Sequence, residues 1–306
     1  MSPPTSLAVC ICTHRRPSEL GRLLRRLQQE SADLAGTVDV GVVVVDDATE
    51  RSAQLVVDAF AGAFPLGIRY TNTASGNIST ARNRAVEGGI AVGSLLAFID
   101  DDCLPDRGWL RELVALQQHT GCDLVSGCCR DEAPAAAPKW FVDGPFLAGP
   151  LDIADGAAME VGAMKNTLAT AEFLTRTGVR FDVSLGVAGG EDVMWFRQAQ
   201  AAGASLRYAA NAVVREMTPI GRTSMRYLLR RALWYGNTES VTCIRSGTYG
   251  RSRMLMSGAK RTLGATARPF TRLVRRQTPQ WRYATTDLLR GVGRMLGAMG
   301  VVIRHH

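Results

Sequence analysis

Short apolar runs alternate with amphipathic segments over the first 130 residues. The run Val38–Val45 is almost entirely β-branched, which is typical of a strand buried on both faces. Between Glu19 and Glu30, leucines recur at the spacing of one helix face. The same patterns predict strands at 7–12, 68–70, 94–99 and 124–128 and helices at 53–60, 79–88 and 109–119. We therefore expect an α/β fold in which helices flank both faces of a mostly parallel central sheet.

Beyond residue 130 the pattern becomes less regular. A segment rich in Pro, Ala and Gly, 130–151, is expected to be an irregular crossover. Strands are then expected at 158–167, 206–208 and 212–214, and helices at 191–202, 224–235, 254–268 and 281–303. Pro269 and Pro279 should separate the last two helices. The charge balance changes near residue 245, so we expect one domain over 1–245 and a basic helical extension over 246–306.

The net charge of the 306-residue chain, +8, is unevenly distributed. Residues 251–306 carry 12 Lys and Arg against one acid, Asp287, while the first 250 residues have a net charge of −3. Such a basic segment suits an anionic membrane surface, and packing against the rest of the chain is the alternative. Nucleic acid is not expected as a partner, because Trp281 and Tyr283 are nearly alone there as stacking residues.

Cysteine usage and hydropathy indicate the compartment. The seven cysteines form no CxxC pair, which favours free thiols in a reducing environment and no zinc site. No signal-peptide pattern and no uncharged apolar stretch of 18 residues is visible. We expect a cytoplasmic protein, placed either in solution or peripherally on the inner face of the plasma membrane.

Two predicted strands end in carboxylates at the edge of the sheet where α/β proteins bind ligands. Asp46 and Asp47 follow one strand, and Asp100–Asp102 follow the other. Three adjacent carboxylates repel one another unless a cation neutralises them, and their oxygens suit Mg²⁺ or Mn²⁺ shared with substrate phosphates. The alternative is a solvated acidic turn. No glycine-rich phosphate loop follows the first strand, so metal and cationic side chains would have to hold any phosphates.

A third acidic pair opens the helix predicted at 191–202. Gly189 and Gly190 precede Glu191 and Asp192. The glycines permit a close backbone approach, and a carboxylate at this helix start can serve as a general base. The simpler interpretation is that the two acids only cap the helix and interact with its dipole.

These segments together resemble family 2 glycosyltransferases with the GT-A fold. The matching pieces are CICTHRRP, VVVVDDAT, GNISTARNRAV, LLAFIDDDCLPDRGWL and FDVSLGVAGGEDVMWFRQ, in the order and spacing typical of that family. The resemblance implies transfer of a sugar from a nucleotide diphosphate donor to an acceptor hydroxyl, mostly with inversion, using Mn²⁺ or Mg²⁺. The acceptor could be lipid-linked, a polysaccharide or a natural product.

The resemblance also assigns roles to individual residues. Asp102 and Asp100 match the metal-binding DxD motif, Asp192 matches the catalytic base, and Glu191 would help to bind the acceptor. A further set would contact the nucleotide or its diphosphate: Thr13, Arg16, Asp47, Arg82, Asp100 and Asp101. A metal-binding His is common in relatives, and Glu216 stands in its place here.

Three residues are weaker candidates for acceptor recognition. Lys165 and Asn166 lie where relatives recognise the acceptor, and a plain surface turn is the alternative. Trp140 could stack on a sugar, although core or loop packing is the better explanation.

Two rival functions remain. A sugar-phosphate nucleotidyltransferase should have a glycine-rich basic loop after the first strand, which residues 13–18 lack. The other rival is a catalytically idle, membrane-associated protein that binds sugar nucleotides or acts as a scaffold. The change at Glu216 favours this rival, whereas the intact Asp102 and Asp192 favour an enzyme.

Overall fold

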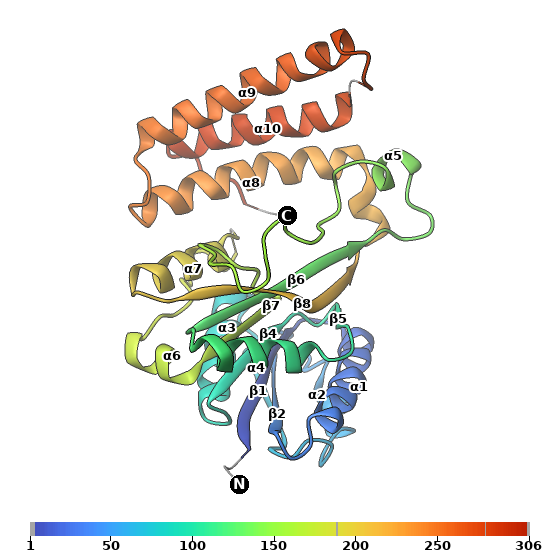
Figure 1. Cartoon of the computed structure of the whole chain (residues 1–306), viewed down its shortest axis with the longest axis vertical. Coiled ribbons are helices and arrows are strands. Elements are labelled where there is room, and N and C mark those ends of the chain that lie inside the picture. Colours follow the sequence, from blue (N-terminus) through green and yellow to red (C-terminus); the bar gives the residue numbers. More distant parts are fainter. Residues whose placement is uncertain (1–3, 188, 279, 305–306) are drawn as a thin grey trace. The chain divides into compact units, whose positions relative to one another are not determined.

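The computed structural model describes residues 4–187, 189–278 and 280–304. In this part of the chain a mixed eight-stranded sheet has the order β3-β2-β1-β4-β7-β6-β8-β5 (Figure 1). The strands are β1 (Thr5–Thr13), β2 (Val38–Asp46), β3 (Ile68–Asn72), β4 (Leu95–Ile99), β5 (Cys103–Pro105), β6 (Leu124–Glu132), β7 (Asn166–Thr170) and β8 (Leu206–Met217).

The strand directions divide the sheet into two parts. The four strands β3, β2, β1 and β4 are mutually parallel. Strand β7 runs antiparallel to both of its neighbours, β4 and β6, and the short β5 pairs antiparallel with β8. The predicted α/β class with helices on both faces is confirmed, and the sheet is mixed because β7 reverses direction at its centre.

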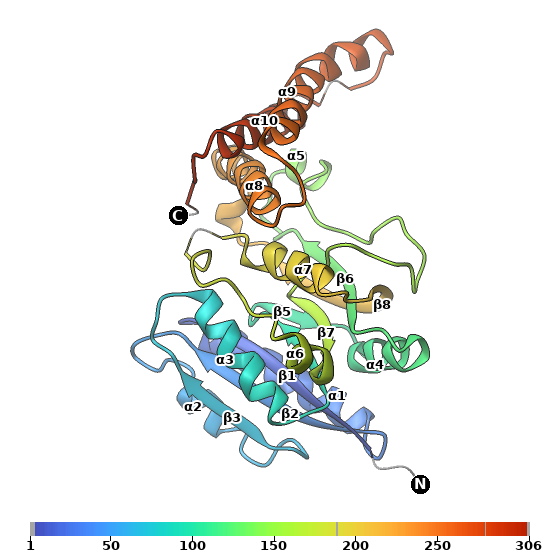
Figure 2. The ribbon, with the colours of Figure 1, turned by 90° about the vertical axis from the view of Figure 1, so that its left-hand side faces the viewer.

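Side chains of β1 alternate between two apolar layers. Leu7, Val9 and Ile11 face the layer built by α1, α2 and α4, whereas Ala8 and Cys10 face the layer built by α3, α6 and part of α7. Figure 2 shows α3 and α6 on the same side of the sheet. The helices of these layers are α1 (Pro17–Asp33), α2 (Gln54–Asp58), α3 (Ile78–Ile90), α4 (Trp109–Thr120), α6 (Ala171–Thr177) and α7 (Glu191–Ala201).

Three predicted strands differ from the structure. The strand expected at 158–167 is mostly irregular; Ala158 forms an isolated bridge, and β7 begins only at Asn166. The two strands expected at 206–208 and 212–214 are one strand, β8, whose pairing register shifts opposite Gly127 and Cys128. Such an irregularity adds unpaired residues without ending a strand, and it interrupts the sequence pattern.

The chain divides into two compact units. The second unit comprises residues 133–147, 187–194 and 218–306, and the first comprises the remainder. The second contains α5 (Lys139–Val142), a short 3₁₀ turn (Ile220–Thr223), α8 (Met225–Arg245), α9 (Arg251–Val274) and α10 (Trp281–Ala298). The predicted division at residue 245 differs from this one, because α8 packs extensively along α10 and belongs with the last two helices (Figure 1).

Helix α9 continues through Pro269, which was expected to end it. Pro279, the other expected breaker, lies outside the described residues. Within the described segments, no helix combines the length and apolarity that crossing a bilayer requires.

Candidate active site

Strands β1, β2 and β4 end next to one another in the first unit, and their last residues form an acidic edge. Asp101 follows β4 and is only 4% exposed. Burial raises its pKa to about 6, although the hydroxyl of Thr13 donates a 2.7 Å hydrogen bond to Oδ2 and so opposes the shift. Asp101 thus ties the end of β1 to the end of β4, as expected if both bordered one site.

Arg16 neutralises two members of the acidic triplet. Its Nη1 lies 3.0 Å from Oδ1 of Asp101 and 2.6 Å from Oδ2 of Asp102. The arginine is also placed at the start of α1, because Pro17 occupies the first helical turn, where its missing N–H is not needed. The guanidinium therefore presents its remaining N–H groups beside two carboxylates, where a phosphate could accept them.

Arg82 supplies a second cation. It lies on α3, whose N-terminus is capped by the Asn77 side chain accepting from the Thr80 N–H. The Arg82 guanidinium packs 5.6 Å from the centre of the Phe181 ring and 3.6 Å from Oδ1 of Asp100. Asp100 is 40% exposed, so this pair borders solvent and can meet a ligand.

Asp47 and Asp46 have different structural roles. Asp46 is fully buried and binds the N–H groups of Ala48 and Ala53. Asp47 accepts four hydrogen bonds from the segment 73–77, three at Oδ1 and one at Oδ2. Burial alone would raise the pKa of Asp47, but these bonds lower it. Asp47 thus holds the loop that leads into α3, and its contact with a base stays a prediction.

Lys165 lies beside the acidic edge in a partly buried group of ion pairs. Residue Asn166 pairs with Ile99 across β7 and β4, which places Lys165 near Asp100. The ammonium of Lys165 lies 2.6 Å from Oε2 of Glu216 and 3.3 Å from Oδ1 of Asp131. Residues 164–165 do form a turn, but the Lys165 side chain is only 21% exposed and is ion-paired, so it is not a plain surface turn. Burial lowers the pKa of Lys165, but the charges of Glu216 and Asp131 and the hydrogen bond to Glu216, acting together with the other nearby groups, outweigh burial and raise it.

Glu216 reaches the same place from β8. It pairs in register with Cys103, the residue that follows Asp102. Glu216 therefore lies near the DxD residues, as predicted. Asp131, the second acid that pairs with Lys165, was not predicted. The sequence did contain a signal for it, because Asp131 and Glu132 are acids at the end of strand β6.

Asn166 belongs to the core of the first unit. It is fully buried, and Oδ1 accepts a 2.8 Å hydrogen bond from the Trp109 indole. Its Nδ2 donates to the carbonyls of Cys128 and Ala212. These bonds join β7, β6, β8 and α4, and they leave no exposed atom for an acceptor. The predicted acceptor contact is corrected to a structural role.

Asp192 and Glu191 lie in the second unit, at the start of α7. Both preceding glycines have a left-handed backbone, with φ of +84° at Gly189 and +92° at Gly190. A Cβ on Gly190 would collide with Thr238 of α8, so the glycine permits this close approach. Asp192 is partly exposed and accepts a hydrogen bond from the Val193 N–H, which leaves it available as a base.

Trp140 packs within the second unit. Its ring meets Phe146 edge-on at 5.7 Å, and the Arg282 guanidinium lies 5.0 Å from its centre. These contacts correspond to the packing alternative. Trp140 stays partly exposed, so stacking on a sugar remains a prediction.

The predicted metal ligands fit a divalent cation only in part. No group of three or more His, Cys, Asp or Glu among residues 4–187, 189–278 and 280–304 is arranged around a common point. Mg²⁺ commonly uses one or two carboxylates and completes its coordination with substrate phosphates and water. Asp100 and Asp102, both partly exposed, suit such a shared ion. Glu216, like Asp102, has a cation 2.6 Å away, so each would have to exchange that partner for the metal ion.

Comparisons with known proteins identify the family and the fold. Residues 8–164 match the family described as Glycosyl transferase family 2. The succinoglycan biosynthesis protein ExoM of Rhizobium meliloti is 31% identical over 84% of this chain and 82% of its own length. The glycosyltransferase AglE of Haloferax volcanii is 29% identical over 56% of this chain, which spans about half (55%) of AglE.

Solved structures support the fold. A structure of S. aureus TarS 1-349 in complex with UDP-GlcNAc has a TM-score of 0.55 and 12% identity, covering 96% of this chain and 92% of that one. A TarS 1-349 complex with UDP is similar, with a TM-score of 0.54 and 13% identity over 97% and 92% of the chains. Of a longer TarS structure, this chain spans 44%. The family match, the ExoM similarity and the GT-A-like sheet together show that this chain belongs to glycosyltransferase family 2.

Proposed function

We propose that the chain transfers a sugar, with inversion at the anomeric carbon, from a nucleoside diphosphate donor to a hydroxyl acceptor. The observation that carries the proposal is the acidic edge of the first unit, where Arg16 and Arg82 lie beside Asp100–Asp102. A nucleoside diphosphate leaves with increasing negative charge, and preorganised cations stabilise such a leaving group. UDP is the first nucleotide to test, because TarS structures contain UDP and UDP-GlcNAc.

The proposed roles follow from position and chemistry. Thr13, Arg16 and Arg82 hold the diphosphate, and Asp47 fixes the adjoining loop and contacts the base. Asp100 and Asp102 would hold Mg²⁺ or Mn²⁺, which supplies further positive charge to the diphosphate when bound.

Asp192 takes the proton of the acceptor hydroxyl while the acceptor oxygen forms a bond to the anomeric carbon and the bond to the diphosphate breaks. A single displacement of this kind inverts the anomeric centre, as base-activated water does in inverting hydrolysis. Glu191 assists acceptor binding in this proposal.

A thermal-shift screen tests donor binding. A ligand that binds only the folded chain raises its stability, by about 2.7 kcal/mol at 100 times its Kd. We expect UDP or another nucleoside diphosphate to raise the melting temperature, and Mn²⁺ to increase that shift. An Arg82→Gln variant should lose most of it, whereas Arg22→Gln, an exposed change on α1, should not. The absence of a shift with every diphosphate tested would contradict the proposal.

The anomeric configuration tests inversion. Proton NMR of the product should show the configuration opposite to that of the donor sugar, and retention would refute the single displacement. Lipid-linked and polysaccharide acceptors are both part of this proposal, as is peripheral binding to an anionic membrane.

A further inference from the structure

The last three helices form a closely packed group, with α10 beside both α8 and α9 (Figures 1 and 2). Glycines permit the close approach on both sides. A Cβ on Gly293 would collide with the Leu233 carbonyl of α8, and a Cβ on Gly291 would lie 2.8 Å from the Gly258 carbonyl of α9. The buried side of α9 is thus fixed against α10.

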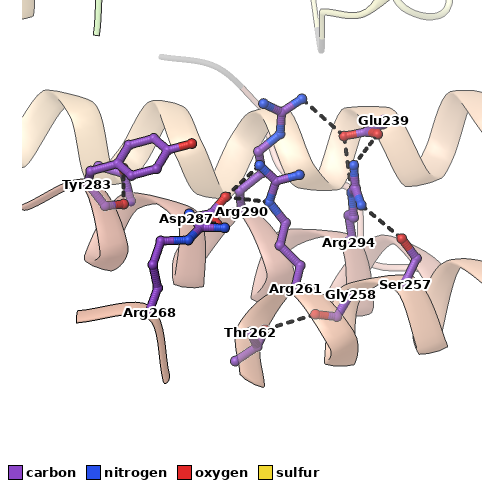
Figure 3. A network of polar contacts seen from close by, with 11 residues as sticks. Glu239, Ser257, Gly258, Arg261, Thr262, Arg268, Tyr283, Asp287, Arg290 and Arg294 are labelled. Atoms are coloured by element: carbon purple, nitrogen blue, oxygen red, sulfur yellow. Dashed lines mark hydrogen bonds and ion pairs between the residues drawn. The ribbon is translucent and has the colours of Figure 1, made fainter. Parts of the chain in front are cut away.

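Part of the basic charge of this group is neutralised internally (Figure 3). Asp287, only 5% exposed, pairs with Arg261 and Arg268 of α9. Glu239 of α8 pairs with Arg290 and Arg294 of α10. Among the described residues, four of the 12 basic side chains in 251–306 are therefore neutralised by ion pairs with Asp287 or Glu239.

The remaining cations lie mostly on the outside of the group. Lys260, Arg275 and Arg276 are exposed, and none of them forms an ion pair within the described segments. Arg253 and Arg282 are exposed as well and pack on the rings of Tyr249 and Trp140. The uncompensated charge is thus concentrated on α9 and on the turn between α9 and α10.

An exposed apolar stripe runs along α9. Met256, Leu263, Phe270 and Val274 are 66%, 69%, 60% and 84% exposed. Their spacing of seven, seven and four residues places them on one helix face. The buried residues of α9, Met254, Gly258, Ala265 and Pro269, repeat at four, seven and four and occupy the opposite face.

The stripe ends in an aromatic pair next to the turn. The rings of Phe270 and Trp281 meet edge-on at 5.4 Å, and Trp281 is 51% exposed. Leu273, also more than half exposed, lies beside Arg275 and Arg276. An indole with arginines next to exposed aliphatic side chains is the combination found at the level of lipid headgroups.

We propose that the outer face of α9 and the α9–α10 turn form a lipid-contact surface that lies in the headgroup region of an anionic bilayer. Its apolar stripe would enter the boundary of the acyl chains, and the unpaired cations beside it would meet lipid phosphates. A bilayer fits better than a protein partner because the stripe follows the outer side of a 24-residue helix, about 36 Å long, flanked by cations without acids. Lipid binding here does not depend on sugar transfer; that the surface serves a lipid-linked acceptor rests on the proposed function.

Vesicle binding of the full chain tests the proposal. Sedimentation is measured with phosphatidylcholine vesicles and with vesicles containing about a third phosphatidylglycerol, at low and high salt. We expect binding to the anionic vesicles that weakens with salt, since exposed charges are screened. A triple variant, Leu263→Gln, Phe270→Gln and Val274→Gln, should reduce partitioning at least tenfold. Glutamine is a good helix former, so the fold should persist.

Matched controls separate this surface from general stickiness. Leu55→Gln changes an 83% exposed leucine in the first unit and should leave binding within twofold. Arg275→Gln with Arg276→Gln should weaken binding severalfold at low salt, while Arg22→Gln with Arg25→Gln should not. Circular dichroism and nucleotide thermal shifts, expected to be unchanged in all variants, report folding and donor binding separately.

Two results would overturn the proposal. One is vesicle binding by the triple variant equal to that of the unchanged chain, or no binding by either. The other is a stable dimer in light scattering that the triple variant converts to a monomer, because the stripe would then be an interface between copies. Loss of donor binding with intact vesicle binding would refute the proposed function alone.

Discussion

Lys165→Met removes the cation that two largely buried carboxylates share. Methionine keeps most of the length of the lysine stem, so the change chiefly deletes the ammonium group. Glu216 and Asp131 then face each other near Asp100 without compensation. Their side chains are only 17% and 11% exposed, so water can screen them poorly.

The magnitude follows from this burial. Breaking a buried ion pair by removing one partner costs about 3–5 kcal/mol, because the other charge stays buried. The partial exposure of Lys165, 21%, places the expected loss near the lower end, at about 3 kcal/mol. Arg215→Met is the matched control: Arg215 also bridges two acids, Asp106 and Glu132, but all three side chains are 36–40% exposed. Such a pair contributes about 0.2–1 kcal/mol.

Urea unfolding followed by circular dichroism measures both losses as shifts of the midpoint at unchanged slope. Burial lowers the pKa of Lys165, but its acidic neighbours Glu216 and Asp131 raise it, and the net result lies above the ordinary lysine value of 10.5. The ammonium group therefore contributes its full stability at any pH below 10.5. This contribution is lost only as the pH rises through the folded pKa. The cost of Lys165→Met should thus be constant from about pH 7 to 9. Equal losses in the two variants would refute the reasoning from burial.

Three further changes test the proposed active site. Asp192→Asn should leave donor binding intact but lower transfer about 10²–10⁴-fold, since the amide cannot accept the proton; turnover within threefold of the unchanged enzyme would exclude it as the base. Asp102→Asn should weaken Mn²⁺-dependent diphosphate binding in calorimetry, while metal-free binding serves as the reference. Gly190→Ala should destabilise the chain by roughly 2–4 kcal/mol in urea unfolding, because φ is +92° and the methyl group meets Thr238; a loss below 1 kcal/mol would contradict this.

The parallel part of the fold could be predicted because its signals are local. The continuous β-branched run Val38–Val45 indicates a strand buried on both faces, and the helical spacing of the leucines of α1 indicates a helix with one buried face. The reversal at β7 could not be predicted in this way, because a five-residue strand shows no direction in its own sequence. Its position between β4 and β6 depends on partners 41 to 75 residues away.

In the candidate site, too, local features could be predicted from the sequence and long-range contacts could not. The acids at strand ends were visible because a charge after an apolar run is conspicuous. Their pairing was not, since Arg16 reaches Asp101 and Asp102 across about 85 residues, and Lys165 reaches Glu216 across 51. Asn166 shows the opposite case: a polar residue next to a candidate cation was read as a site residue, whereas its three hydrogen bonds make it part of the core.

The charge of the C-terminal segment shows what a tally by sequence omits. Glu239 lies before residue 245 and so counted toward the nearly neutral part, yet it neutralises two arginines of α10. Asp287 counted as a single negative charge, but it occupies two arginines at once. Whether a basic side chain is free to meet a ligand therefore depends on the helix face it occupies, and the net charge of the segment does not reveal this. The spacing of Met256, Leu263, Phe270 and Val274 in the sequence places them on the face of α9 opposite its buried residues. A helix that buries one face and has large apolar side chains on the other can bury the second face only against another surface.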